Sequence, residues 1–380
     1  MVVTFLNPPR DSMKTTRFET RRRRMLESLA PLEAEALIVT HLPNVRYLTG
    51  FSGTAGILVL ESVQDSVLIT DSRYLSQSKE EIGELPTRKV VGSYDETLAR
   101  YARDRAHRTL AYEEAHCAVS RLRILESALP ETTRLIGCQG LVESLRAVKD
   151  EEELERLERA ARGLEPTVRS LRDEIRAGAS ERTLAAELDY RLRQSGYDKT
   201  AFDTIVASGP RSALPHGRPT DRRFEPGDLV VIDFGGVMDG YASDVTRTFS
   251  VGEPSPEARH IYDTVREAQQ AAIAAVRPGI EAQEVDRVAR DVIESANLGE
   301  FFGHGTGHGI GLEVHESPWI SPGRAERLQA GMVFTVEPGI YIPGKGGVRL
   351  EDDVLVTEEG CRLLSRGEKA LQEFSWVCYV

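Results

Sequence analysis

Five side chains in the C-terminal half of the chain have the types that bind divalent metal ions: Asp233, Asp244, His308, Glu337 and Glu351. Each lies in a short apolar or glycine-rich segment, where a charged side chain needs a special reason. Four carboxylates brought together without cations would repel one another and lose hydration, at a cost of several kcal/mol per ion. Two divalent ions would balance four carboxylates and a neutral imidazole. This is the composition of a two-metal hydrolase site.

Two neighbouring segments indicate how the aspartates are positioned. LVVIDFGG, residues 229–236, predicts a buried strand that ends with Asp233 at a glycine turn. YASDVTRTF, residues 241–249, predicts a second strand that carries Asp244. A hairpin of the two strands would set both carboxylates side by side. Either aspartate alone is more often a turn or edge residue, so the prediction depends on their joint presence inside a repeat.

A glycine-rich segment, FFGHGTGHGIGLEVHE at residues 301–316, carries the histidines. Its glycines remove side-chain bulk, so that the backbone can pass close to a ligand. We expect His308 to be the metal ligand, with His304 and His315 on either side of it as substrate-facing groups. A phosphate-binding loop is the alternative, but no G-x-G-x-x-G frame fits, and neither a Walker-type loop nor H-E-x-x-H occurs.

The last two carboxylates lie in strand-like segments. Glu337 lies in FTVEPGIYI, and Glu351 lies in GGVRLEDDVLV with Arg349 two residues before it, on the same face of a strand. We expect Arg349 to orient a ligating carboxylate, and Asp352 and Asp353 to face solvent or close a turn. Oxygen-rich ligation with one histidine and no thiolate favours Mn²⁺; Zn²⁺, Co²⁺ and Fe²⁺ remain open.

The length of 380 residues predicts two domains. From about residue 15 to 145, short apolar strands alternate with helix-like segments, which is typical of a compact α/β domain. The composition changes near residue 148, where a long charged helix begins that is interrupted or bent near Pro166. We therefore predict domains at residues 1–147 and 148–380.

The second domain contains an internal repeat. PGDLVVIDFG begins at residue 226 and AGMVFTVEPG begins 104 residues later, at 330. Upstream helical segments match at nearly the same offset and align Gly178 with Gly279. Each half is predicted to be a helix pair followed by strands, an α+β unit. A pseudo-two-fold arrangement would bring Asp233 and Glu337 to equivalent places, with the site between the halves.

The composition is that of a globular protein that does not bind nucleic acid. Hydrophobic residues make up 40% and charged residues 28% of the chain. A net charge of −12 argues against a nucleic-acid surface, and the run from Arg21 to Arg24 is expected on the solvated face of a first helix. No apolar run approaches the roughly 20 residues of a membrane helix.

The start of the chain and the cysteines indicate a cytoplasmic protein. The first residues lack a sustained apolar stretch with a small-residue cleavage site, so we expect no signal peptide. Met13 is an alternative start to Met1 and would leave a floppy leader before it. Four cysteines without C-x-x-C spacing are expected to be reduced and mostly buried: Cys117, Cys138, Cys361 and Cys378.

With these motifs in place, the chain resembles the pita-bread metallopeptidases, in particular the Xaa-Pro peptidases prolidase and aminopeptidase P. The resemblance is strong from about residue 150 to 372, in SGPRSALPHG, HGTGHGIGLEVHE, VEPGIYI and GVRLED. It is weaker in NVRYLTGFSG and ITDSRY, which resemble the creatinase-like N-terminal domain of that family. The implied fold is an α/β creatinase-like domain followed by an α+β pita-bread domain.

The resemblance also implies roles for the residues. Asp233 and Asp244 would bind one of two metal ions, with Asp244 also touching the second, and His308 would complete the second site. The remaining ligands, Glu337 and Glu351, would contribute to both. The implied reaction is hydrolysis of the Xaa-Pro bond of a peptide, with Glu337 as general base and then general acid.

Three histidines would contact the substrate if the resemblance holds. His216 and His315 would stabilise the tetrahedral oxyanion, and His304 would line the proline side. A homodimer is also implied. Prolidase, which acts on dipeptides, is the favoured interpretation and needs a cation for the proline carboxylate. Of Arg46 and Arg73 we favour Arg46 for that role. The alternatives are aminopeptidase P, which acts on longer peptides, and a non-catalytic peptide-binding module.

Overall fold

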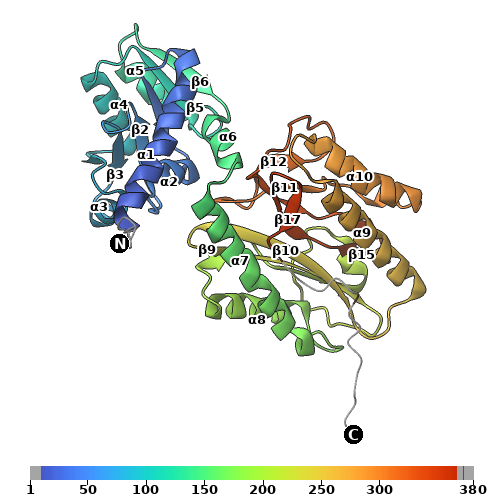
Figure 1. The fold of residues 1–380 in the computed structure, drawn as a ribbon. Helices are drawn as coiled ribbons and strands as arrows, with labels where there is room; N and C mark the ends of the chain where they lie inside the picture. The colour runs from blue at the N-terminus through green and yellow to red at the C-terminus, as the bar shows by residue number, and fades with distance from the viewer. Residues whose placement is uncertain (1–9, 366–370, 372–380) are drawn as a thin grey trace, which may run out of the picture. The chain divides into compact units, whose positions relative to one another are not determined.

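The computed structural model describes residues 10–365 and residue 371. The chain divides into two compact units, Met1–Arg146 and Ala147–Val380 (Figure 1). Helix α1 begins at Arg10, before the alternative start at Met13. Most of the predicted leader and Cys378 lie outside the described residues.

The first unit is an α/β fold around one mixed six-stranded sheet, as the alternating pattern predicted. Its strand order is β4-β3-β2-β1-β5-β6. Strand β1 is antiparallel to β2 and parallel to β5, and β6 continues parallel to β5. The strands are β1 (Ala36–Val39), β2 (Ile57–Leu60), β3 (Val67–Thr70), β4 (Thr87–Lys89), β5 (Thr109–Glu113) and β6 (Arg134–Cys138). The helices are α1 (Arg10–Leu29), α2 (Leu42–Thr49), α3 (Leu75–Ile82), α4 (Tyr94–Asp104), α5 (Val119–Ala128) and α6 (Leu141–Ala147), with a 3₁₀ turn η1 (Ala30–Leu32).

The second unit contains the predicted repeat of helices and strands. Its helices are α7 (Glu151–Ser170), α8 (Glu181–Gln194), α9 (Pro256–Ala275) and α10 (Ala282–Ser295), with 3₁₀ turns η2 (Arg172–Glu174), η3 (Gly209–Ala213) and η4 (Gly299–Phe301). One sheet holds β7 (Lys199–Thr200), β8 (Ile205–Ser208), β9 (Leu229–Met238) and β10 (Tyr241–Ser250). The other holds β11 (Gly307–Gly309), β12 (Glu316–Ile320), β13 (Val333–Val336), β16 (Asp352–Val356) and β17 (Cys361–Leu363), beside a hairpin of β14 (Gly339–Ile342) and β15 (Gly346–Arg349).

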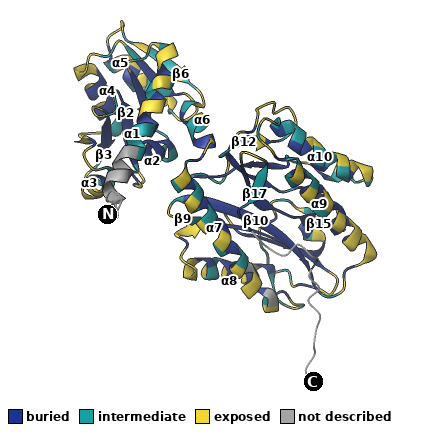
Figure 2. Cartoon of the chain, in the orientation of Figure 1, coloured by how far each residue is buried: buried dark blue, intermediate teal, exposed yellow. Residues whose placement is uncertain are grey.

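Each half of the second unit has its own apolar core. Residues of α7 and α8 pack with β8, β9 and β10, and residues of α9 and α10 pack with β13 to β16. Figure 2 shows that β9 and β10 are buried, whereas the outer faces of α9 and α10 are exposed. The amphipathic helices therefore cover the sheets, and the acidic segments identified in the sequence lie on the strands.

The backbone repeats between the halves in detail. Gly178 and Gly279 precede α8 and α10 with φ angles of 85° and 84°, a left-handed conformation that favours glycine. The amide of Gly178 donates to the carbonyl of Phe224 at 2.9 Å, and that of Gly279 donates to the carbonyl of Leu328 at 2.7 Å. In both halves, then, the turn before the second helix is tied to the segment that leads into the central strand.

Helix α7 continues through Pro166 for another turn, so the predicted interruption there is wrong. The missing amide of proline removes one helical hydrogen bond. Leu157, Ala160, Ala161 and Leu164 are nevertheless buried, and this apolar face keeps the helix in place. The helix ends at Ser170 instead.

Three predictions about burial are wrong in whole or in part. Arg23 and Arg24 of α1 are exposed as predicted, but Arg21 and Arg22 are buried and donate to the carbonyl oxygens of Tyr47 and Leu48. Asp352 and Asp353 are buried, not solvent-exposed. The described thiols are only half-buried: Cys117, Cys138 and Cys361.

Candidate metal centre

The β9–β10 hairpin positions two carboxylates on one face of its sheet. In the antiparallel register Asp233 is opposite Thr246, and Asp244 is opposite Gly235. Since side chains alternate along a strand, Asp233 and Asp244 share a face two residues apart. Strand β9 does not end at Asp233 as predicted but continues to Met238. A side chain at Gly235 would overlap the carbonyl oxygen of Ser243, so this glycine permits close packing rather than a turn.

The second half supplies the other three potential ligands. His308 lies in the middle of β11, between β12 and β13. Glu337 follows β13 directly, and Glu351 directly precedes β16. The glycines around His308 are required by packing, because a Cβ at Gly307 would overlap the carbonyl of Thr335. This close packing explains the glycine-rich pattern. It also places the imidazole of His308 toward the β9–β10 hairpin.

The five side chains meet at one place. Ligand atoms of Asp244, His308 and Glu351 lie within 4.8 Å of one another. Nε2 of His308 lies 3.2 Å from Oε1 of Glu337 and 4.0 Å from Oδ2 of Asp244. Asp233 accepts a hydrogen bond of 2.6 Å through its Oδ2 from Nη2 of Arg349.

Several carboxylates have one anchored oxygen and one that no protein group satisfies. Arg349 holds Oδ2 of Asp233, and Thr246 Oγ1 donates to Oε2 of Glu351 at 2.6 Å. Across the described part of the chain, Oδ1 of Asp233, Oδ1 of Asp244 and Oε1 of Glu351 are buried without a hydrogen-bond partner. Buried unsatisfied oxygens are costly, and divalent cations would remove that cost. The residues therefore fit a pair of hard divalent ions.

The electrostatics without cations agree with this fit. Burial, followed by repulsion from the other carboxylates, raises the pKa of Asp244 and of Glu351 well above the ordinary range. Burial also raises the pKa of Asp233, although Arg349 opposes the shift. Burial is the largest single effect on Glu337 and would raise its pKa, but the hydrogen bond and charge of His308, with the charges of His304 and Arg349, together outweigh it and lower the pKa to about 2. Glu337 is thus ionised at neutral pH, while its neighbours resist ionisation unless a cation is present.

A cavity of about 590 Å³ opens beside these ligands. His216, His304 and His315 all line it. Both ring nitrogens of His304 have protein partners, since Nδ1 lies 2.7 Å from the carbonyl of Gly305 and Nε2 lies 3.0 Å from the hydroxyl of Tyr341. His304 therefore presents the surface of its ring to the cavity. Burial lowers the pKa of both His304 and His315, which favours neutral imidazoles.

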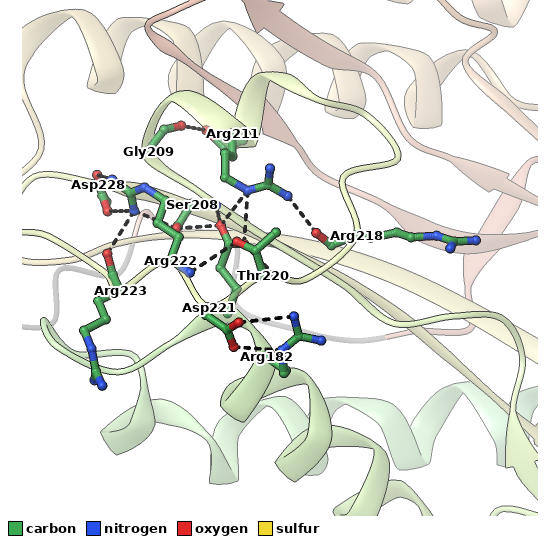
Figure 3. Close-up of polar contacts among 12 residues, drawn as sticks. Arg182, Ser208, Gly209, Arg211, Arg218, Thr220, Asp221, Arg222, Arg223 and Asp228 are labelled. Carbon is green, nitrogen blue, oxygen red and sulfur yellow. Dashed lines mark hydrogen bonds and ion pairs between the residues drawn. The ribbon is translucent and has the colours of Figure 1, made fainter.

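The loop that carries His216 is held by a buried carboxylate. Glu181, at the start of α8, accepts hydrogen bonds from the amide and hydroxyl of Thr220 and from the hydroxyl of Ser208. Figure 3 shows the surrounding contacts, including the one from Arg211 to the carbonyl of Arg218 at 2.7 Å. The loop is thus fixed at both ends, and His216 projects between them.

Sequence reasoning missed part of the cavity wall. The additional lining residues are Phe202, Asp203, Ile205, Arg218, Trp319 and Ser321. Arg218 is the most informative, because its side chain is 89% exposed and lies 4.0 Å from Asp203. It follows His216 by two residues, so the same motif could have drawn attention to it. Of the described residues, those that line the cavity all belong to the second unit, and Arg46 in α2 of the first unit is not among them.

Comparison with known proteins agrees with the fold. Residues 155–358 match metallopeptidase family M24, and residues 21–148 match the creatinase/prolidase N-terminal domain. An Xaa-Pro dipeptidase of Pyrococcus horikoshii is 37% identical over 362 residues, covering 92% of this chain and 97% of that protein.

Solved structures give the same result. An Xaa-Pro dipeptidase from Bacillus anthracis superimposes with a TM-score of 0.89 at 37% identity, covering 93% of this chain and 99% of that one. An X-Pro aminopeptidase from Thermotoga maritima has a TM-score of 0.82 at 40% identity, covering 89% and 97%.

The fold and its converging carboxylates are those of a metallopeptidase, with a creatinase-type N-terminal domain and a pita-bread C-terminal domain. The chain belongs to metallopeptidase family M24.

Proposed function

We propose that the protein is an Xaa-Pro dipeptidase, which hydrolyses the bond between a first residue and a following proline. The observation that carries the proposal is the set of buried carboxylate oxygens without protein partners at the wall of a peptide-sized cavity. The dipeptidase and aminopeptidase relatives support the reaction class. The domains that would carry the activity are residues 1–147 and 148–380.

Two divalent ions per chain would be held by the set Asp233, Asp244, His308, Glu337 and Glu351. When bound, they would polarise the scissile carbonyl and acidify an attacking water. Mn²⁺ is the ion that we favour on the oxygen-rich ligand set, with Zn²⁺, Co²⁺ and Fe²⁺ as alternatives. Arg349 would orient Asp233 from behind and leave its other oxygen for the ion.

The side chains around the ligands would transfer the proton, stabilise the oxyanion and bind the proline. Glu337 would accept the proton of the attacking water and pass it to the leaving prolyl nitrogen. His216 and His315, both exposed in the cavity, would donate to the developing oxyanion. The ring of His304 would pack against the proline, which has no amide hydrogen to recognise.

A preference for dipeptides needs a cation that meets the proline carboxylate. Within the cavity wall, Arg349 is committed to Asp233 and Tyr341, while Arg218 lines the cavity with an exposed side chain. We therefore add Arg218 to Arg46 as a candidate for this contact. If neither arginine matters, aminopeptidase P activity on longer peptides is the better description.

The proposal also covers the cellular location of the protein and its oligomeric state. In the described part of the chain, no helix has the length and apolar character needed to cross a membrane. We propose cytoplasmic residence, because the described cysteines Cys117, Cys138 and Cys361 are free thiols, and a homodimer, on the family resemblance. Light scattering of the purified protein measures the assembly directly.

The deciding experiment is a length series with the purified, metal-loaded enzyme. Gly-Pro, Gly-Pro-Ala and Gly-Ala would be assayed with added Mn²⁺ and after chelation. We expect metal-dependent cleavage of Gly-Pro, slower cleavage of the tripeptide and none of Gly-Ala. Cleavage of the tripeptide in preference would favour aminopeptidase P, and no cleavage with bound metal would favour the non-catalytic module.

A further inference from the structure

A second group of potential metal ligands lies in the first unit. His41, His116 and Glu143 each offer one ligand atom, and these atoms lie within 4.8 Å of one another. Nε2 of His116 is 3.4 Å and Nδ1 of His41 is 4.0 Å from the same oxygen, Oε1 of Glu143. The side chains are 18% to 32% exposed, so an ion can reach them without unfolding of the unit.

The topology of the sheet brings these three residues together. Strands β1, β5 and β6 are parallel, so their carboxyl ends lie at one edge of the sheet. His41 follows β1 by two residues, His116 follows β5 by three, and Glu143 lies on α6, which follows β6 (Figure 1). This edge is where open α/β sheets place their ligands.

Side chains behind the group hold it in place. Nδ2 of Asn44 donates to Oε1 of Glu143 at 2.6 Å and to Oε1 of Glu113 at 2.6 Å, and its Oδ1 accepts from Arg146 at 2.7 Å. The other oxygen of Glu113 accepts from the amide of His41 at 2.9 Å. Outer contacts of this kind orient metal ligands.

The charges beside the rings also favour an ion. The imidazoles of His41 and His116 are stacked, with centroids 3.7 Å apart and an angle of 3° between the planes. Because the lone pair of an imidazole nitrogen lies in the plane of its ring, one of the two rings has to rotate out of this stack before both can bind the same ion. Glu113 and Glu143, joined through one neutral amide, supply negative charge beside that place.

We propose that His41, His116 and Glu143 bind one Zn²⁺ ion, with water as the fourth ligand. Two imidazoles and a carboxylate suit zinc, whose bonds of about 2.0–2.2 Å place tetrahedral ligand atoms about 3.4 Å apart. The distance from His116 to Glu143 already has this value, whereas His41 lies 4.0 Å from the same oxygen and has to approach and turn its ring toward the ion. The ion would link the three segments that follow β1, β5 and β6.

The test counts zinc ions in the full-length protein. Asp244→Asn/Glu351→Gln is used as the background, because neutral side chains there remove two potential ligands of the other centre without adding a charge. After chelation and dialysis against Zn²⁺, we expect this background to retain one equivalent more than the same protein with His116→Ala. Glu143→Gln should lose the same equivalent, and His260→Ala, which changes an exposed histidine of α9, should keep it.

A spectroscopic readout separates ligation from a change in folding. Co²⁺ in place of Zn²⁺ should give visible absorption bands in the background protein, and His116→Ala should remove them while the far-ultraviolet circular dichroism stays the same. Equal zinc content with and without His116, or a background that binds no Zn²⁺ at micromolar concentration, would overturn the site. Peptide hydrolysis is not measured here, so the proposed dipeptidase activity can fail or succeed independently.

Discussion

Arg349 and Asp233 are joined by a 2.6 Å hydrogen bond although they lie 116 positions apart in the chain. Asp233 comes from β9 in one half of the second unit, and Arg349 comes from β15 in the other. The same guanidinium donates to Thr246, to the hydroxyl of Tyr341 and to the carbonyl of Pro215, next to His216. One buried cation therefore fixes a potential metal ligand and the loop that carries a substrate-facing histidine.

Replacing this arginine should weaken metal binding. Arg349→Lys keeps the charge but lacks the planar fork that reaches several acceptors at once. We expect a loss of about 10- to 100-fold in metal affinity, measured by calorimetric titration of the chelated protein. Arg362→Lys, in a half-exposed pair with Glu158, is the matched control and should bind metal normally. Normal affinity in Arg349→Lys would mean that the arginine serves only packing.

Loss of the proposed proton carrier should affect turnover more than substrate binding. In Glu337→Gln the side chain keeps its shape but cannot accept a proton, and general acid–base groups contribute about 10²- to 10⁴-fold. We expect kcat for Gly-Pro to fall within or beyond that range, because a ligand is lost as well. Metal content is measured in the same sample. A variant that retains both ions and full kcat would contradict the assignment.

The metal-free protein should become less stable as the pH rises. Burial raises the pKa of Asp353 to about 7 and raises those of Asp244 and Glu351 above their ordinary range. Such groups make their full contribution to the free energy of unfolding below the unfolded carboxyl pKa of about 4. That contribution is lost as the pH rises through the pKa of the folded state. The lowered pKa values of His304 and His315 act in the opposite sense, but only below about pH 6.5.

The measurement is thermal unfolding of chelated and Mn²⁺-loaded protein between about pH 6.5 and 8. Tm of the chelated protein should fall across this range, and bound metal should reduce or reverse the fall because it stabilises the ionised carboxylates. Parallel curves for the two samples would show that the ions do not interact with these groups.

The choice between dipeptides and longer peptides should depend on an arginine. If Arg218 meets the proline carboxylate, Arg218→Ala should lower kcat/KM for Gly-Pro by about 10-fold or more and leave Gly-Pro-Ala less affected, as expected for loss of a charged hydrogen bond. Arg46→Ala tests the other candidate in the same assay. Arg182→Ala, an exposed arginine paired with Asp221, is the control. An unchanged ratio in a variant removes that arginine from the proposal.

Much of the fold and the site could be predicted because the relevant signals are local or repeated. The hairpin that carries Asp233 and Asp244 follows from two strand-like segments a few residues apart. The repeat followed from matching glycines, and the structure gives Gly178 and Gly279 nearly the same φ angle.

The remaining errors concern contacts that a sequence pattern does not contain. Gly235 resembles a turn residue, yet it lies within β9. Glycine is needed there because the carbonyl oxygen of Ser243 on the partner strand leaves no room for a side chain. Asp352 and Asp353 look like a solvated acidic pair, but elements far away in the chain hold them in the interior. Arg247 and Gln269 donate to Asp352, and Ser243 donates to Oδ2 of Asp353. Arg218 lies two residues after His216 in the same motif, but only the cavity lining shows that it belongs to the site.

The division of the ligands between two halves has a consequence for biosynthesis. When a nascent chain has been made as far as β10, it contains only Asp233 and Asp244 of the five potential ligands. His308 follows about 60 residues later, after a few more seconds of synthesis. The growing polypeptide thus cannot complete this set of five side chains around a cation before Glu351 has been made. We therefore expect metal to enter the centre of the second unit only after its second half has folded onto the first.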